Sequence, residues 1–427
     1  MMVIPLANRR RWLFAGSGLF VCLFAILAAV EFAASRFAAQ PDLASLRRAV
    51  WLSPGNAAYR HRLGRFYAFV AANPQLAIDS FRAAIQLNPH AARYWFDLAA
   101  AYEVTGNSTA QRDALEHALQ AEPTAPDVAW EAANFFLVQG DTDRALREFR
   151  VVVENDPYLP STALQSCWRV RPDTDALLRD VVPARTDSLL TFLEMLMSKQ
   201  ETEGTIKVWD RLMQLHQKFE SHYLLDYMRY LLLARRPVTA GEVWENAAPL
   251  LGLSAYLPNP DNLIVNGDFS LDVLNGGLDW TYLNRPGVKL LLDPSDFYAG
   301  RRSLSITFEG PGIDNAAIQQ FIPVHGDSPY EFTAYYKAVD FEGAGGPEIT
   351  LRDAYTNEVL FAGETMTDSD FWKPVHGQFT TPPYTSLLLL NIERNPPGSP
   401  IRGKLWVDDF QLAPGNDSGG ASDKGQP

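Results

Sequence analysis

The sequence predicts a multidomain α plus β protein that has a single N-terminal transmembrane helix, then an α-helical solenoid of repeats, and then an antiparallel β-sandwich. Three observations predict this order. A long apolar run opens the chain, prolines then recur at an almost constant spacing, and the residue pattern changes from helical to strand-like near residues 257–260. With 427 residues and 47% apolar content, the chain is long enough to bury two separate cores.

The apolar run covers residues 12–34 and contains one charged residue, Glu31. As a helix it spans about 35 Å, which is enough to cross a bilayer. Three arginines at positions 9–11 precede it, whereas Arg36 alone follows closely, so residues 1–11 are predicted to stay cytoplasmic. We therefore expect a single-pass protein of the inner (cytoplasmic) membrane with its bulk in the periplasm. A cleaved signal peptide is the alternative, because small residues follow the run.

The prolines recur with the period of a helical hairpin. Spacings of 35, 34 and 34 residues separate Pro54, Pro89, Pro123 and Pro157. Small and large apolar residues recur at matching places before the last three of these prolines: Leu63, Gly64, Tyr67, Ala77, Phe81 and Ala84; Leu98, Ala99, Tyr102, Leu115 and Ala118; Ala132, Ala133, Phe136, Ala145, Phe149 and Val152. Residues 41–157 therefore resemble tetratricopeptide repeats (TPRs), and residues 158–255 are predicted to continue as degenerate helical repeats. The resemblance implies a groove that recruits a protein partner, here an envelope protein.

Beyond residue 260, short alternating segments are separated by Gly, Pro, Asn and Asp, so residues 261–414 are predicted to form an antiparallel β-domain. Sequence landmarks follow one another at 262–269 (NLIVNGDF), 280 (W), 298–304 (YAGRRSL), 319–321 (QQF), 330–338 (YEFTAYYKA), 371–372 (FW) and 405–410 (LWVDDF). In this order they resemble the jelly-roll carbohydrate-binding modules that are appended to glycanases. Residues 415–427 are rich in Gly, Ser and Asp and are predicted to be a disordered tail.

Sugar binding requires aromatic rings that stack on the C–H faces of pyranoses, and polar side chains that pair with the hydroxyl groups. The aromatic candidates are Tyr282, Tyr336, Tyr355 and Trp372, and the polar candidates are Gln319, Arg352 and Asn391. For each aromatic residue the alternative is core packing, because strands of a sandwich bury alternate residues.

Many modules of this family carry a structural calcium where the first and last strands meet. The resemblance therefore implies carboxylate ligands from Asp268 and from Asp408 or Asp409. This chain has Ser270 where the family commonly has an acidic residue, and the change removes one strong ligand. The alternative is that Asp408 and Asp409 cap or solvate the last strand. We expect no required cofactor, with a structural calcium as the one metal that the resemblance allows.

Composition and motifs argue against other functional classes. The net charge is −13, and the basic N-terminus contributes about +3 to it, so the rest of the chain carries about −16 and is not expected to bind nucleic acid. No nucleophile elbow, phosphate-binding loop or zinc-protease motif is present, and the seven histidines are scattered. We therefore expect no enzyme activity.

Together these features predict a membrane-anchored extracytoplasmic scaffold of a bacterial-type envelope. Its repeats would recruit a protein partner and its β-sandwich would bind a polysaccharide or oligosaccharide, an architecture that suits assembly or export of envelope polysaccharide. The alternative is a purely structural assembly subunit that binds no sugar. A glycoside hydrolase is a weaker alternative and would need two facing carboxylates in the sandwich.

Overall fold

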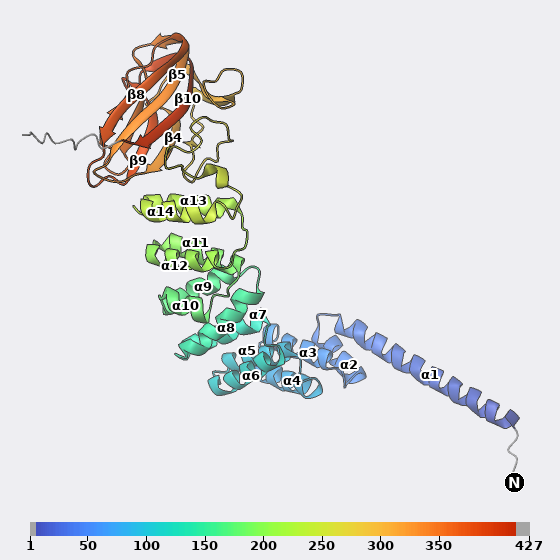
Figure 1. Cartoon of the computed structure of the whole chain (residues 1–427). Helices are drawn as coiled ribbons and strands as arrows, with labels where there is room; N and C mark the ends of the chain where they lie inside the picture. Colours follow the sequence, from blue (N-terminus) through green and yellow to red (C-terminus); the bar gives the residue numbers. More distant parts are fainter. Residues whose placement is uncertain (1–5, 416–427) are drawn as a thin grey trace, which may run out of the picture. The chain divides into compact units, whose positions relative to one another are not determined.

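The computed structural model describes residues 6–415, with side chains from residue 16 onward. Along this part of the chain, helices α1–α14 precede strands β1–β10, and the chain divides into two compact units between Met195 and Leu196. The predicted fold class is confirmed: an apolar N-terminal helix, TPR-like helical hairpins and an antiparallel sandwich (Figure 1). Part of the predicted cytoplasmic segment and nearly all of the predicted tail, residues 416–427, lie outside the described residues.

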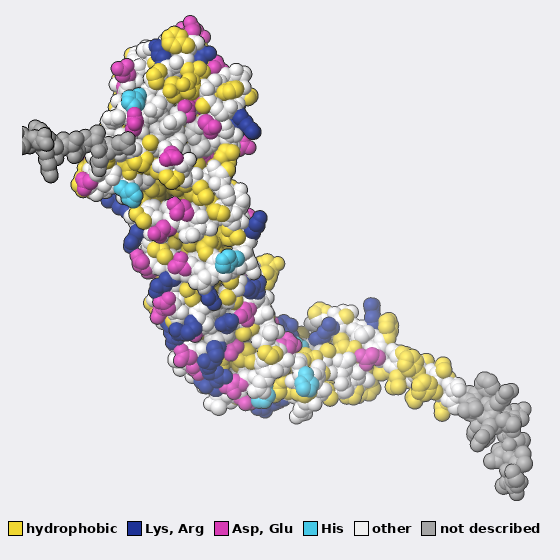
Figure 2. Space-filling model, viewed as in Figure 1, with side chains coloured by type: hydrophobic (Ala, Val, Ile, Leu, Met, Phe, Trp, Pro, Cys, Tyr) yellow, Lys and Arg dark blue, Asp and Glu magenta, His cyan; other side chains and the backbone are white. Residues whose placement is uncertain are grey.

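Helix α1 (Leu6–Ala38) contains the apolar run that was predicted to span a membrane. From Gly16 to Ala38 it is long and apolar enough to cross a bilayer, as either an anchor or a signal sequence would be. Most of its described side chains are exposed, and hydrophobic side chains cover its visible face (Figure 2).

The last turns of α1 pack against the helices that follow. Glu31 Oε1 accepts a hydrogen bond from Tyr59 Oη at 2.7 Å and another from Asn56 Nδ2 at 3.1 Å. Ala34 and Ala38 are buried in one cluster with Tyr59. A membrane span would therefore end before Glu31, and the remaining part of the apolar run still covers about 28 Å as a helix.

The next helices pair as antiparallel hairpins after a single leading helix: α2 (Leu43–Leu52); α3 (Ala57–Phe69) with α4 (Pro74–Leu87); α5 (Ala92–Val104) with α6 (Ser108–Ala121); and α7 (Pro126–Val138) with α8 (Thr142–Asn155). Short polar side chains cap the first turns of α2, α3, α4, α6 and α8. Asn73 Oδ1 accepts from the backbone N–H of Leu76, and Asp141 Oδ1 accepts from that of Arg144. Pro89 and Pro123 lie in the turns between hairpins, where a residue without N–H does not interrupt a helix.

The alternation of small and large residues in the repeats is explained by close helix packing. A Cβ atom on Gly64 would lie 2.6 Å from a ring carbon of Phe81, so glycine allows α3 to approach α4. Ala99 and Ala133 occupy matching places in the next two hairpins and are almost fully buried. These small residues leave room for large partners such as Phe149, which is fully buried.

The remaining helices are α9 (Pro160–Val170), α10 (Thr174–Asp180), α11 (Thr186–Lys199), α12 (Thr202–Met213), α13 (Ser221–Leu233) and α14 (Pro237–Ala247). Helices α12–α14 belong to the same compact unit as the sandwich. The indole of Trp244 on α14 is fully buried and donates to the carbonyl of Tyr256 at 2.8 Å. Gly277, with φ of +67°, lets a loop of the β-domain pack directly on this indole. Helix α14 is thereby joined to the β-domain.

The sandwich contains two antiparallel five-stranded sheets. The first has the order β1-β4-β9-β6-β7, with β1 (Thr281–Tyr282), β4 (Asn315–Pro323), β9 (Leu387–Asn395), β6 (Gly346–Asp353) and β7 (Val359–Ala362). The second has the order β2-β3-β10-β5-β8, with β2 (Val288–Asp293), β3 (Ser303–Gly312), β10 (Pro400–Pro414), β5 (Pro329–Gly343) and β8 (Ser369–Thr380). We call these the first and second sheets.

Apolar side chains from both sheets fill the space between them. Phe332 and Phe410 of the second sheet are fully buried and pack with one another at a centroid distance of 6.3 Å. Trp280 and Phe269, which precede β1, stack at 5.2 Å and close one end of this core. Because strand residues alternate between faces, the residues between these core positions point outward.

Candidate functional site

The outer face of the first sheet is lined by polar side chains. Strands β4, β9 and β6 are neighbours, and their register places Gln319 opposite Asn391 and Asn391 opposite Thr350. The flanking residues Leu390 and Leu351 are buried in the core, so these polar residues point away from it. Amide and hydroxyl groups of this kind are suited to pairing with sugar hydroxyls.

Arg352 of β6 lies further along the same face and is held by Glu393 of β9. Its Nε and Nη2 donate to the two carboxylate oxygens of Glu393 at 2.8 and 2.6 Å, and Nη1 donates to the carbonyl of Asn357. The hydrogen bond with Glu393 raises the pKa of Arg352 above its usual value. The two parallel hydrogen bonds hold the guanidinium of Arg352 in one orientation.

A cavity of about 640 Å³ adjoins this face on the side of β1 and β4. Its sheet side includes Gln319 and Phe321 of β4 and Tyr282 of β1, and its opposite wall comes from one side of α13, including Leu225 and Arg229. Its size and mixed polar and apolar lining are typical of small-ligand sites.

Three of the seven predicted glycan-binding residues line this cavity: Tyr282, Gln319 and Tyr355. The Tyr282 side chain is 38% exposed. The Tyr355 hydroxyl instead donates to the carbonyl of Leu232 on α13 at 3.0 Å, and burial raises its pKa to about 12. Tyr355 thus both lines the cavity and joins α13 to the sandwich.

Arg352 and Asn391 share the outer face with Gln319 but do not line the cavity. Asn391 is 8% exposed, so little of it is accessible to a ligand. Arg352 is already paired with Glu393. Of the three polar candidates, Gln319 alone lines the cavity, and Arg352 and Asn391 lie on the sheet face beside it.

The other two predicted residues lie elsewhere. Tyr336 is 7% exposed and packs in the core, because residues of β5 alternate and Phe332, Ala334 and Tyr336 all face inward. Its ring therefore has no open face for a sugar, which corrects the expectation for this residue. Trp372 lies on β8 of the second sheet, 6.1 Å from the ring of Tyr298. The predicted aromatic residues do not form one platform.

The three predicted calcium ligands already have protein partners, and Asp409 Oδ1 accepts a hydrogen bond from Gln411 Nε2 at 2.9 Å. Both oxygens of Asp268 accept from Ser270, one from its backbone N–H and one from its hydroxyl at 2.7 Å. Asp408 is fully buried, and its oxygens accept backbone N–H groups of Tyr298, Ala299 and Asp409. Burial raises the pKa of Asp408 to about 6. No cluster of three or more potential metal ligands occurs among the described residues.

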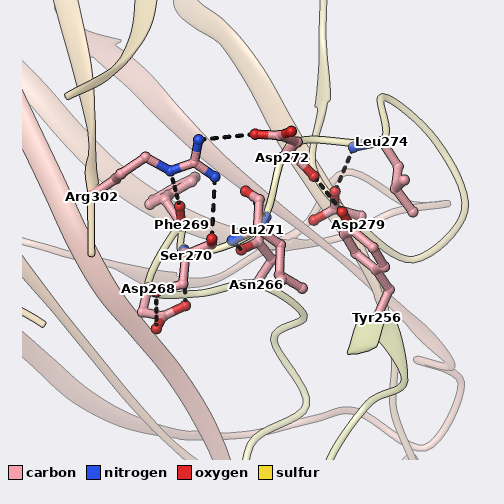
Figure 3. Close-up of polar contacts among 10 residues, drawn as sticks. All are labelled: Tyr256, Asn266, Asp268, Phe269, Ser270, Leu271, Asp272, Leu274, Asp279 and Arg302. Atoms are coloured by element: carbon pink, nitrogen blue, oxygen red, sulfur yellow. Dashed lines mark hydrogen bonds and ion pairs between the residues drawn. The ribbon is translucent and has the colours of Figure 1, made fainter. Parts of the chain in front are cut away.

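A guanidinium group occupies the turn that the opening motif forms. Arg302 donates to the carbonyl of Phe269 at 3.1 Å, to the carbonyl of Ser270 at 3.2 Å and to the carboxylate of Asp272 at 2.9 Å (Figure 3). Carbonyl and carboxylate oxygens are the groups that would otherwise face a hard cation. Arg302 therefore places a positive charge beside these oxygens, so a calcium ion in this turn would have to displace the guanidinium.

Sequence reasoning missed the arginines that line the cavity, Arg229, Arg235 and Arg285. Two of them lie on or just after α13, and the third follows β1. Nothing in their local pattern separates them from ordinary surface arginines. Their grouping depends on the packing of α13 against the sandwich.

A family model for a carbohydrate-binding domain, CBM_4_9, matches residues 261–399. No curated protein sequence shows significant similarity to the chain. Among solved structures, one described as "CBM4 structure and function" is 20% identical, covering 36% of this chain and 99% of its own, with a TM-score of 0.28. The CBM22-1 xylan-binding domain of Paenibacillus barcinonensis Xyn10C is 24% identical over 37% of this chain and 96% of its own, with a TM-score of 0.26. A crystal structure of MamA is 15% identical over 40% of this chain and 85% of its own, with a TM-score of 0.24.

The family match and the β-sandwich coincide along the chain, since residues 261–399 contain β1–β9 in full. The description of the matched model is that of a binding domain. The chain thus carries a C-terminal domain of the carbohydrate-binding module type after a TPR-like helical region.

Proposed function

We propose that this protein is a membrane-anchored extracytoplasmic scaffold whose β-domain binds a glycan and whose repeats recruit an envelope protein. The observation that carries the glycan proposal is the cavity on the first sheet. Tyr282, Gln319 and Tyr355, selected for their chemistry alone, line this one cavity although they are far apart in the sequence.

The cavity offers the two kinds of contact that a sugar requires. Tyr282, which is 38% exposed, provides an aromatic ring for the C–H face of a pyranose. The amides of Gln319 and Asn315 provide donors and acceptors for hydroxyl groups. Phe321 and Leu387 add apolar surface to the lining.

We further propose that α1 stays attached as an anchor rather than being cleaved as a signal peptide. Cleavage at the small residues after the apolar run would remove Glu31, the hydrogen-bond partner of Tyr59 and Asn56. It would also remove Ala34, which is fully buried. The first helices of the array would then expose an apolar surface, so retention of α1 is the more stable arrangement.

The mass of the mature chain, purified from membranes, tests the anchor proposal. A mass that corresponds to a chain retaining residues 12–34 supports an anchor. A mass that corresponds to a chain beginning after residue 34 overturns the proposal. The orientation, with the basic N-terminus in the cytoplasm, is tested separately by protease access to the array in intact spheroplasts.

One observation favours the alternative of a purely structural subunit. The Tyr355 hydroxyl is bound to the carbonyl of Leu232, and Arg235 lies over its ring at 5.2 Å. These contacts show that part of the cavity lining already has a structural task, joining α13 to the sandwich. On this alternative, the cavity would be a packing defect at that junction.

Binding of the full chain in detergent to a panel of immobilised polysaccharides separates these functions. We expect Tyr282→Ala and Gln319→Ala each to weaken binding about tenfold, because each removes a stacking or hydrogen-bonding contact. Trp372→Ala, on the second sheet, is the matched control and should bind like the unmodified chain. Loss of binding in Trp372→Ala alone would move the site to the second sheet, and no retention on any polysaccharide would favour the structural subunit.

A further inference from the structure

We infer that the cavity between α13 and the first sheet selects an acidic sugar, and that the carboxylate of a uronic acid binds among Arg229, Arg235 and Arg285. This inference rests on the proposed glycan function and specifies its ligand class. The inference depends on the cavity wall that the helical region forms, because two of the three arginines lie on or next to α13 and not in the sandwich.

The charge of the cavity is opposite to that of the protein. The chain has a net charge of −13, yet the described residues that line the cavity include three arginines and one acidic residue, Asp226. A local excess of positive charge in a concave site attracts anions and raises their local concentration. An uncharged glycan would not gain this electrostatic attraction.

The guanidinium groups are available to a ligand to different degrees. Arg229 is exposed, and no hydrogen bond or ion pair joins it to another described residue. Arg285 makes one long hydrogen bond, 3.4 Å, to Asn315 Oδ1. Arg235 lies over the ring of Tyr355 and has no carboxylate partner among the described residues. By contrast, Arg352 on the same sheet face is neutralised by Glu393.

The cavity wall that carries Arg229 and Arg235 is attached to the sandwich by two contacts. Tyr355 Oη donates to the Leu232 carbonyl, and the close approach of Gly277 to Trp244 fixes the adjoining loop on α14. A planar guanidinium held at a fixed place matches the two oxygens of a carboxylate. Tyr282 and Gln319 lie across the cavity, where the ring and hydroxyls of the same sugar residue would contact them.

The test compares one polymer with and without its charge. The full chain in detergent is titrated with polygalacturonate oligosaccharides and with the same oligosaccharides after reduction of their carboxyl groups to alcohols. We expect the acidic form to bind at least about tenfold more tightly, since hydrogen bonds to a charged group are the stronger ones. The difference should shrink at high salt, because ions screen the exposed guanidinium groups.

Two variants and a control assign the effect to the cavity. Arg229→Gln and Arg285→Gln should each lower affinity for the acidic oligosaccharide about tenfold and lower affinity for the reduced form by a much smaller factor, because a hydrogen bond to a neutral hydroxyl is weaker than one to a carboxylate. Arg402→Gln removes an exposed arginine of β10 in the second sheet and should change neither affinity. Both lining arginines are on the surface or half-buried, so circular dichroism should show an unchanged fold.

The outcomes distinguish this inference from the proposed function. Equal binding of the acidic and reduced forms, with no effect of Arg229→Gln, would overturn the acidic ligand but keep a glycan site. Binding of a phosphorylated mannan without binding of polygalacturonate would overturn the carboxylate in favour of a phosphate. No binding of any oligosaccharide would overturn both proposals together.

Discussion

The two outer faces of the sandwich differ in chemistry and in what adjoins them. The face of the first sheet carries amides and an arginine–glutamate pair, and α13 walls a cavity beside it. The face of the second sheet carries aromatic rings, and these rings contact one another: Tyr298 stacks on Tyr335 at 3.7 Å, and Trp372 lies beside Tyr298. A choice of candidate binding face from aromatic content alone would have selected the face of the second sheet.

The difference teaches that exposure of an aromatic residue does not by itself distinguish the two faces, since Tyr298 and Phe371 on the side of the second sheet are 46% and 68% exposed, against 38% for Tyr282, which lines a cavity. On the second sheet, Trp406 donates to Asp293 Oδ2 at 2.9 Å and has Lys404 over its ring at 4.1 Å. The indole N–H and one face of the Trp406 ring are therefore already in contact with protein groups. On the first sheet, Tyr282 has a partly exposed side chain and a cavity in front of it.

The largest expected effect comes from separating the helical wall from the first face. In Gly277→Ala, the new Cβ would lie 2.3 Å from the Trp244 ring, at a backbone conformation with φ of +67°. We expect a loss of about 2–4 kcal/mol in the stability of this junction, together with loss of glycan binding. Hydrogen exchange of the backbone amides in α13 and α14 measures the loss of stability.

Gly241→Ala is the matched control for this change. Gly241 lies within α14, and an added Cβ there meets nothing within 4 Å. We expect it to stabilise the helix by about 0.5–1 kcal/mol. Unchanged protection of α13 and α14 in Gly277→Ala would show that this glycine does not hold the wall, and the comparison of the two faces would lose its basis.

The next effect is a pH dependence of stability that comes from Asp279, two residues after Gly277 in the same loop. Asp279 is 1% exposed, and burial raises its pKa to about 6 from an ordinary value near 3.8. Between these values the folded state keeps a proton that the unfolded chain releases, so stability falls as pH rises from about 4 to 6 and is level above that. The shift corresponds to a loss on the order of 2–3 kcal/mol.

Asp279→Asn should remove this part of the pH dependence. Asp279 Oδ2 accepts from the Leu274 N–H at 2.7 Å, and the amide oxygen of asparagine can keep that bond. Oδ1 has no hydrogen-bond partner among the described residues. Hydrogen exchange of the sandwich strands at pH 5 and pH 7 measures the change. Asp408 contributes a slope of the same sign, which the variant should retain.

A smaller effect separates the ion pairs of the two faces. Arg352→Ala removes three hydrogen bonds and leaves Glu393 without its partner, so we expect a loss of about 1–2 kcal/mol. Lys337→Ala on the second face removes one hydrogen bond to Asp296 at 2.7 Å and a cation–π contact with Trp406 at 5.7 Å, and we expect a loss of less than about 1 kcal/mol. Thermal unfolding measures the loss of stability in each variant. Equal losses would contradict the expectation that the ion pair on the first sheet is the stronger one.

The smallest expected effect is that of calcium on the melting temperature of the sandwich. Because Arg302 occupies the acceptors of the opening turn, the melting temperature of the sandwich should be the same in EDTA and in millimolar calcium. Arg302→Ala should lower it by vacating the carbonyls of Phe269 and Ser270. A rise in melting temperature with calcium in the unmodified chain would show that a metal binds despite the guanidinium.

Much of the architecture follows from local patterns. The proline spacing and the small residues such as Gly64 and Ala99 predict hairpins because each repeat meets its neighbour at the same places. The opening and closing motifs predict a sandwich, and the structure contains one. The choice of Gln319, Arg352 and Asn391 as polar candidates selected residues that share one sheet face, although whether they bind a glycan is still a prediction.

The tertiary structure alone decided which of those residues face a cavity. Tyr336 and Tyr282 are the same residue type in strands of one domain, yet the first is buried between the sheets and the second is partly exposed. By itself the sequence determined the repeats, the apolar helix and the sandwich, because these depend on periodicity along the chain. The cavity and its three arginines required the fold, because they come from helix α13, its end and a strand loop that meet when the helical region packs on the sheet.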